Sequence, residues 1–246
     1  MQRMLANIFY GLWLCSAISV EAAQATVAVA TNFKTAAEQL AAAFNASHPH
    51  QITLVSGSTG KLYTQISLGA PFDLFLAADR ERPAQLIASG LAVPGTLHTY
   101  AVGQLALLGQ AHVDENTLSG DNFRSLAIAN PALAPYGRAA MEVLTHLNLT
   151  EKVRHKIVRG QNVGQAYMLI SSGNASIGLI ASTLLQPEDQ PYSWLIPSHY
   201  HTPVEQALVM LKRGAKNAAA SDFLAFIHSQ RGSDMIRDFG YLAPAS

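Results

Sequence analysis

Cysteine and charge are both scarce in this chain of 246 residues. Its one cysteine, Cys15, lies in the N-terminal apolar stretch, so the rest of the chain can form neither a disulfide nor a thiolate metal site. Charged residues make up only 13% of the sequence, and the formal net charge is zero. This balance argues against nucleic acid or an anionic membrane as a partner. The 49% of hydrophobic residues instead favours a well-buried globular protein.

Long apolar runs are also lacking, except at the N-terminus. There Arg3 precedes an apolar core over residues 8–20, and small residues follow up to Ala25. The pattern is typical of a cleavable secretory signal, which we assign to residues 1–25. An uncleaved anchor is less favoured, because the core is short for a membrane span of about 20 residues. Leu14 stands where a lipoprotein signal requires a small residue, so we expect a soluble exported protein and not a lipid-anchored one.

Strand and helix patterns alternate along the rest of the chain. Strands are expected at 27–30, 52–55, 73–77, 100–108, 125–129, 157–159, 176–180 and 205–211. Helices are expected at 35–44, 62–68, 82–89, 137–147, 163–171, 218–229 and 233–239, with polar loops at 130–136 and 187–191. The repeated strand–helix–strand rhythm predicts an α/β protein whose sheets are mainly parallel.

This rhythm occurs in two blocks, which predicts two lobes. We expect lobe I to comprise residues 26–100 and 204–246, and lobe II residues 101–203. The chain would then cross between the lobes near 99–103 and 202–206. Two such crossings are expected to form a hinge.

Polar turns follow several of the predicted strands and stand where a helix begins. Thr31 and Asn32 form the first turn, residues 56–60 the second and residues 160–162 a third in the other lobe. The first amides of a helix lack intrahelical partners, and the helix dipole places partial positive charge there. Such a site holds an anion without a cationic side chain. Polar helix starts in both lobes therefore predict an anion cleft between them.

Short motifs in a characteristic order resemble those of one family. They are VAVATNF at 27–33, SGSTGKL at 56–62, GAPFDLF at 69–75, GLAVPG at 90–95, IANP at 128–131, APYG at 134–137, QNV at 161–163 and FGY at 239–241. Together they resemble the periplasmic molybdate-binding proteins of molybdate ABC transporters over nearly all of the chain after the signal. The resemblance implies a two-lobed type II periplasmic-binding-protein fold that holds a tetrahedral oxyanion between its lobes.

The resemblance also implies the ligand contacts. The family's positions correspond here to Thr31, Asn32, Ser58, Thr59, Tyr136 and Val163, the last through its backbone amide. Some members use a further tyrosine after the strand predicted at 176–180, where this chain has Ala181. Tyr136 replaces a small residue of those members, so it could supply the lost hydroxyl. No acid in residues 130–136 matches the family branch with six-fold coordination, so we expect plain tetrahedral binding, with no protein atom bonded to the metal.

We therefore expect a monomeric periplasmic solute-binding protein that captures molybdate or tungstate and delivers it to a membrane permease. It would need no cofactor and would not be an enzyme. Another oxyanion such as sulfate remains the alternative ligand, whereas protonated phosphate needs an acceptor carboxylate that the predicted site lacks. An exported hydrolase is less favoured, since the chain has no Gly-x-Ser-x-Gly nucleophile elbow.

Two other motifs are weaker. Residues 58–61 resemble the end of a phosphate-binding P-loop, but Val55 and Leu62 stand where that motif needs a glycine and a serine or threonine. We therefore expect no nucleotide site. His199 and His201 form a pair without a clear third ligand, so polar surface is favoured over a metal site.

Overall fold

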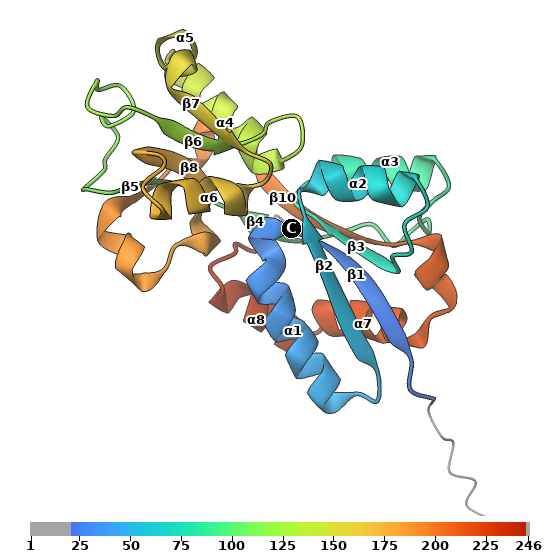
Figure 1. The fold of residues 1–246 in the computed structure, drawn as a ribbon. Coiled ribbons are helices and arrows are strands. Elements are labelled where there is room, and N and C mark those ends of the chain that lie inside the picture. The colour runs from blue at the N-terminus through green and yellow to red at the C-terminus, as the bar shows by residue number, and fades with distance from the viewer. Residues whose placement is uncertain (1–20, 245–246) are drawn as a thin grey trace, which may run out of the picture.

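A computed structural model describes residues 21–244 of the protein. The apolar core of the predicted secretory signal lies outside the described residues. Two five-stranded sheets with flanking helices form two lobes (Figure 1). The predicted two-lobed α/β fold is thereby confirmed. No helix within residues 21–244 is long and apolar enough to cross a membrane.

The sheet of lobe I has the order β2-β1-β3-β10-β4. Its strands are β1 (Gln24–Ala30), β2 (Gln51–Gly57), β3 (Leu74–Ala77), β4 (His98–Gly103) and β10 (Val204–Met210). Its helices are α1 (Lys34–Ser47), α2 (Thr59–Ser67), α3 (Glu81–Ala88), α7 (Ala218–His228) and α8 (Gln230–Asp238). Strand β10 runs antiparallel to β3 and β4, and the other pairs are parallel.

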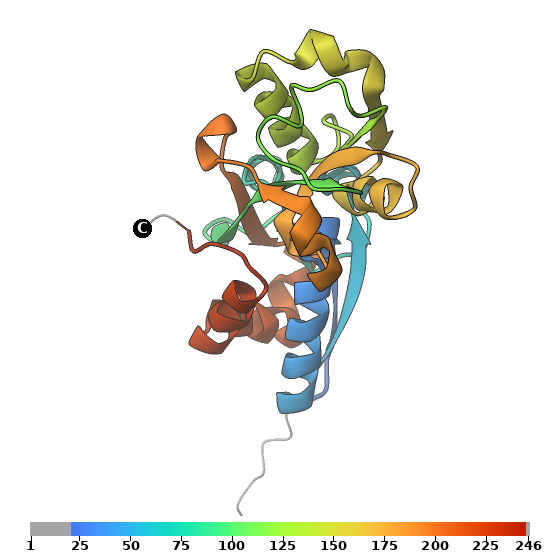
Figure 2. The same ribbon diagram turned by 90° about the vertical axis from the view of Figure 1, so that its left-hand side faces the viewer.

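Strand β1 shows why this sheet is covered on both faces. Val27 and Val29 pack in one core cluster with residues of α1 and α7, whereas Ala28 packs in another with residues of α2 and α3. Successive side chains of a strand point to opposite faces, so the unbroken apolar run of β1 needs helices on both sides. In Figure 2, α1, α7 and α8 lie together below the second lobe.

The sheet of lobe II has the order β7-β6-β8-β5-β9, which repeats the topology of lobe I. Its strands are β5 (Leu105–Gly109), β6 (Leu126–Ala129), β7 (Ile157–Gly160), β8 (Ile177–Ala181) and β9 (Ser193–Leu195). Its helices are α4 (Pro135–His146), α5 (Thr150–Val153) and α6 (Val163–Ser171). In both sheets four strands run in one direction and one runs against them.

The single strand predicted at 100–108 is wrong, because two strands occupy this run. Strand β4 pairs with β10 in lobe I, and β5 pairs with β8 in lobe II, with Gln104 between them. The chain therefore passes between the sheets at Gln104 and returns between β9 and β10. A continuous apolar run predicts extended backbone, but it does not reveal that its two halves join different sheets.

Several element boundaries also differ from prediction. Helix α4 begins at Pro135, so Tyr136 lies in a first helical turn and not in the predicted loop. Proline suits this position, since its missing N–H would have no intrahelical partner there. Helix α2 begins at Thr59, three residues before the predicted start. The loop predicted at 187–191 is a 3₁₀ helix over Pro187–Tyr192.

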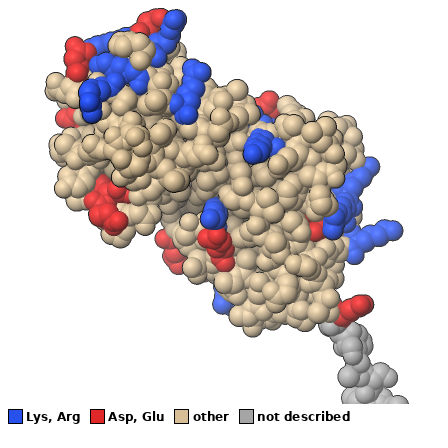
Figure 3. Space-filling view, in the orientation of Figure 1, with Lys and Arg blue, Asp and Glu red and all other residues tan. Residues whose placement is uncertain are grey.

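Charged side chains of both signs are scattered over the surface seen in Figure 3. Lysine and arginine side chains gather mainly at the outer end of lobe II in this view. This distribution leaves most of the visible surface uncharged, as the low content of charged residues predicts.

Candidate functional site

All six residues predicted as ligand contacts line one cavity between the lobes, here called the interlobe chamber. Lobe I contributes Thr31, Asn32, Ser58 and Thr59, and lobe II contributes Tyr136 and Val163. The other lining residues are Ala30, Ala78, Ala134, Pro135 and Asn162. The centre of a water-sized sphere can move within about 10 Å³ of the chamber, which is roughly the room that one water molecule needs. None of its lining residues carries a charge.

Three α-helices begin at the chamber: α2 from lobe I, and α4 and α6 from lobe II. Ser58 is the N-cap of α2, with extended backbone and a side chain that accepts no capping hydrogen bond. Asn162 is the N-cap of α6, and its side chain accepts a hydrogen bond of 2.9 Å from the backbone N of Gln165. The amide of Val163 in that first turn has no intrahelical acceptor. The dipoles of α2, α4 and α6 therefore all place partial positive charge at the chamber.

The hydroxyl groups of Thr31 and Thr59 differ in their hydrogen bonding. Thr59 Oγ1 accepts a hydrogen bond of 3.1 Å from the backbone N of Ala78, which leaves its own proton to donate. Thr31 Oγ1 is buried and has no hydrogen-bond partner among the described residues. An unpaired buried polar group costs about 1–3 kcal/mol. Such a group at a cavity wall indicates a place for a ligand.

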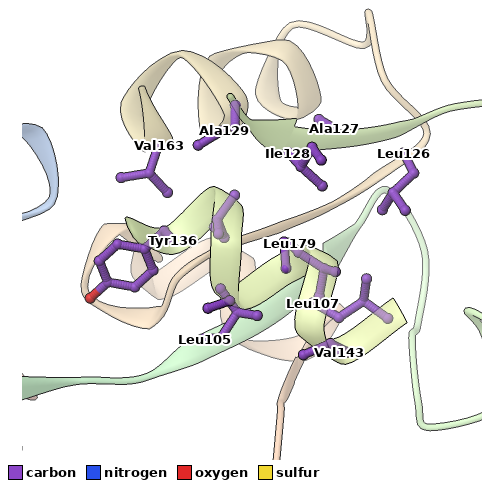
Figure 4. Packing of buried hydrophobic residues seen from close by; sticks show 14 of the residues in the cluster. Leu105, Leu107, Leu126, Ala127, Ile128, Ala129, Tyr136, Val143, Val163 and Leu179 are labelled. Carbon is purple, nitrogen blue, oxygen red and sulfur yellow. The ribbon is translucent and has the colours of Figure 1, made fainter. Parts of the chain in front are cut away.

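Tyr136 belongs both to the core and to the chamber wall. Its side chain is 1% exposed, and its ring packs in the lobe II core with Leu105, Val163 and Leu179 (Figure 4). Its hydroxyl has no partner among the described residues and lies against Gly103, where an added Cβ would overlap it. Burial, with a smaller effect of Tyr241, raises the pKa of Tyr136 well above its usual value. The hydroxyl therefore keeps its proton and stays a donor.

Asn32 does not direct its side-chain donors into the chamber. Its Nδ2 donates to Gln206 Oε1 at 2.7 Å and to the Tyr241 hydroxyl at 3.0 Å. The Tyr241 hydroxyl in turn donates to the backbone oxygen of Asn32 at 2.9 Å. An amide group has only two N–H donors, so both are used. Asn32 is left with its backbone amide as the group that can face an anion.

Gln206 and Tyr241 therefore hold the side chain of Asn32 in place, a role that the sequence patterns did not indicate. Gln206 is fully buried in β10, and its Nε2 donates to the backbone oxygen of Val204 at 3.0 Å. A glutamine on the apolar run that follows the exposed Glu205 is the signal that could have identified it, since buried polar groups need partners. Tyr241 lay inside the FGY motif, but no role was assigned to it.

The remaining predictions concern residues outside the chamber. Ala181 ends β8, is fully buried and does not line the chamber. Tyr136 is the one residue with a hydroxyl among the lobe II residues that do line it. Lys61 is exposed and also lies outside the lining. His199 and His201 belong to no group of three or more histidine, cysteine, aspartate or glutamate residues within 21–244 that could hold a metal.

Comparison with known proteins gives consistent matches over nearly the whole chain. A family model described as bacterial extracellular solute-binding protein matches residues 25–242. The chain is 38% identical over 229 residues to the molybdate-binding protein ModA of Rhodobacter capsulatus, covering 92% of this chain and 91% of that protein. It is 35% identical to the molybdate-binding protein ModA of Azotobacter vinelandii, covering 98% and 97% of the two chains.

A solved structure matches equally well. The periplasmic molybdate-binding protein of Azotobacter vinelandii has a TM-score of 0.85 and 36% identity to this chain, covering 90% of this chain and 100% of that one. The resemblance inferred from the sequence motifs is thereby confirmed. On the family match and on these relatives together, the chain belongs to the bacterial extracellular solute-binding protein family.

Proposed function

We propose that this protein captures molybdate or tungstate in the interlobe chamber and delivers it to an ABC permease. The observation that carries the proposal is the chamber itself, where six positions of the molybdate-binding family meet between the lobes. Relatives that are 38% and 35% identical bear the name molybdate-binding protein, which supports the same ligand.

The donor set suits a fully deprotonated dianion. Six groups can donate, and no carboxylate lines the chamber to accept a hydrogen bond from a protonated ligand. The donors are the hydroxyls of Thr31, Ser58, Thr59 and Tyr136 and the backbone amides of Asn32 and Val163. Hydrogen bonds to a charged group contribute about 1.5–3 kcal/mol each. Six would give roughly 9–18 kcal/mol before ordering costs, and a micromolar site needs about 8 kcal/mol. Neutral donors are therefore sufficient.

Burial of the chamber requires the lobes to separate during binding. Ser58, Thr59 and Tyr136 are each at most 4% exposed, so an anion reaches them only when the lobes move apart. We propose that the two crossings, at Gln104 and between β9 and β10, act as the hinge. The closed form is selected because donors from both lobes bind one anion.

We further infer the cellular setting from the N-terminal pattern. Residues 1–25 would be removed on export, leaving a monomeric periplasmic protein that binds its ligand without a cofactor and without chemical change. Its proposed partner is the membrane permease of the transporter. Intact-mass analysis of exported protein should show a chain that begins near Ala23 to Thr26.

Calorimetric titration of the purified protein with molybdate, tungstate, sulfate and phosphate tests the proposal. We expect molybdate and tungstate to bind at least tenfold more tightly than sulfate, because a donor set spaced for the longer metal–oxygen bond leaves the smaller anion underbonded, and each unpaired donor costs about 1–3 kcal/mol. Equal or tighter binding of sulfate would contradict the assignment.

A further inference from the structure

Charged side chains connect the two lobes beside the chamber. Arg138, near the start of α4 in lobe II, places Nη1 2.9 Å from Oε2 of Glu81 in lobe I. Its Nη2 lies 3.1 Å from Oδ2 of Asp79, in the same lobe as Glu81. We call Asp79, Glu81 and Arg138 the interlobe clasp. One guanidinium thus binds two carboxylates of the opposite lobe.

Asp79 is the stronger partner of Arg138. Its side chain is 9% exposed, against 58% for Glu81, so water and salt screen the Asp79 contact less. Asp79 is also fixed within its own lobe, because its Oδ1 accepts a hydrogen bond of 3.0 Å from the backbone N of Arg82, whose guanidinium pairs with Oδ2. Lobe I therefore holds the acceptor independently of Arg138, although Arg82 Nη2 also reaches lobe II, where it donates to the backbone oxygen of Ala132 at 3.2 Å.

The clasp lies next to the chamber without forming part of it. Ala78 and Pro135 line the chamber, and both also line a neighbouring groove of about 330 Å³ that contains all three clasp residues. None of the clasp residues lines the chamber itself. The clasp residues are therefore placed to act on a bound anion through the position of the lobes and not by contact.

We propose that Arg138 is an affinity-determining residue that never touches the anion. By joining α4 to Asp79 and Glu81 it stabilises the closed form, and it slows release because its contacts must break before the lobes open. The inference rests on the proposed function of anion capture by closure. A contact present only in the closed form raises the closed fraction, and with it the apparent affinity. The open form is taken to predominate without ligand, so association through that form changes little.

Stopped-flow measurement of molybdate association and release tests this role in the Arg138→Gln variant. We expect release to be about 3- to 10-fold faster and association to change less than twofold. Arg138→Lys should release molybdate at an intermediate rate, because the ammonium group keeps the positive charge but cannot reproduce the guanidinium's separate contacts to Asp79 and Glu81. The matched control is Arg154→Gln, which removes the same charge from an exposed arginine whose one ion pair within residues 21–244 is with Glu151 of its own lobe. It should release molybdate at the rate of the unaltered protein.

Equal release rates for Arg138→Gln and Arg154→Gln would overturn the inference. Slower association with unchanged release would also overturn it, since Arg138 would then attract the anion from solution. Failure of the unaltered protein to bind molybdate would instead refute the proposed function. The distance between the two lobes, measured without molybdate, would then test the clasp.

That distance can be measured with fluorophores on the exposed positions of Gln39→Cys and His155→Cys, one in each lobe, since the only native cysteine is Cys15. Arg138→Gln should shift the distribution towards longer distances, and Arg154→Gln should not. Identical distributions for the two variants, with and without anion, would refute a clasp.

Discussion

Replacement of Thr31 by valine separates the cost of an unpaired hydroxyl from its use in binding. Thr31→Val keeps the shape of the side chain and removes Oγ1, which is buried without a partner among the described residues. In the unliganded protein the change should leave the free energy of unfolding unaltered or raise it by up to about 1–3 kcal/mol. For a chain of this size, each kcal/mol gained raises the melting temperature by roughly 2–4 °C.

Molybdate binding should respond in the opposite direction. If Oγ1 donates to the bound anion, its loss removes a hydrogen bond to a charged group, which contributes about 1.5–3 kcal/mol. The dissociation constant should therefore rise about 10- to 150-fold. Calorimetry with molybdate and thermal unfolding without it measure the two effects on the same sample.

Thr59→Val is the matched control, because it makes the same chemical change at a hydroxyl that already has a partner. The backbone N of Ala78 donates to Thr59 Oγ1 at 3.1 Å, so this variant leaves a buried amide unpaired. This variant should lose about 1–3 kcal/mol of unfolding free energy. It should also bind molybdate less tightly. Unchanged molybdate affinity in Thr31→Val would show that Oγ1 is no ligand. A lower melting temperature would show that the hydroxyl has a partner in the unliganded protein.

Three further changes test other parts of the site. Tyr136→Phe should weaken molybdate binding by about 1.5–3 kcal/mol in calorimetry, and a lower melting temperature with intact affinity would assign the hydroxyl to the fold instead. Gly164→Ala should raise the stability of α6 by up to about 1 kcal/mol, because alanine is the better helix former. It should weaken molybdate binding, because the added Cβ would lie 2.6 Å from Thr31 Cγ2 of the other lobe when the lobes are closed. Unchanged molybdate affinity would refute the contact between Gly164 and Thr31 in the closed form. Stability should fall as the pH rises from about 10 towards 12, because burial raises the pKa of Tyr100 well above its usual value and that of Tyr241 to about 12. The folded state then keeps protons that the unfolded state loses. Urea unfolding at pH 9, 10 and 11 measures this slope, which Tyr100→Phe should flatten.

Much of the fold could be predicted because local pattern and tertiary environment agree. The run of residues 27–30 is apolar on both faces, and β1 does lie between two helical layers. Helix α6 begins and ends where its pattern predicts, at Val163 and Ser171. Strand β9 was missed because three residues, Ser193–Leu195, are too few to show a period. Its place is decided by pairing with β5, which no local pattern reports.

The chamber was predictable as a set of positions but not as a set of hydrogen bonds. The motifs around residues 31 and 59 indicated which turns meet the ligand. They did not show that Asn32 is bound to Gln206 and Tyr241, which lie 174 and 209 residues away in the sequence. Nor did they indicate the clasp, since Arg138 and Glu81 are ordinary surface charges until the lobes close. Contacts between distant segments depend on the arrangement of two sheets, which periodicity does not contain.

The separation of charge from the chamber has a physical consequence for selectivity. A Coulomb attraction falls off slowly with distance, so an arginine inside the chamber would hold sulfate almost as well as the larger molybdate. Hydrogen bonds depend steeply on distance and angle, so fixed hydroxyls and helix-start amides distinguish anions by size. With Arg138 confined to the clasp, the charged groups can strengthen closure without adding affinity for the wrong anion. Moving a cation to the wall, as in Ala134→Arg, should therefore reduce the preference for molybdate over sulfate, and an undiminished preference in calorimetry would contradict this reasoning.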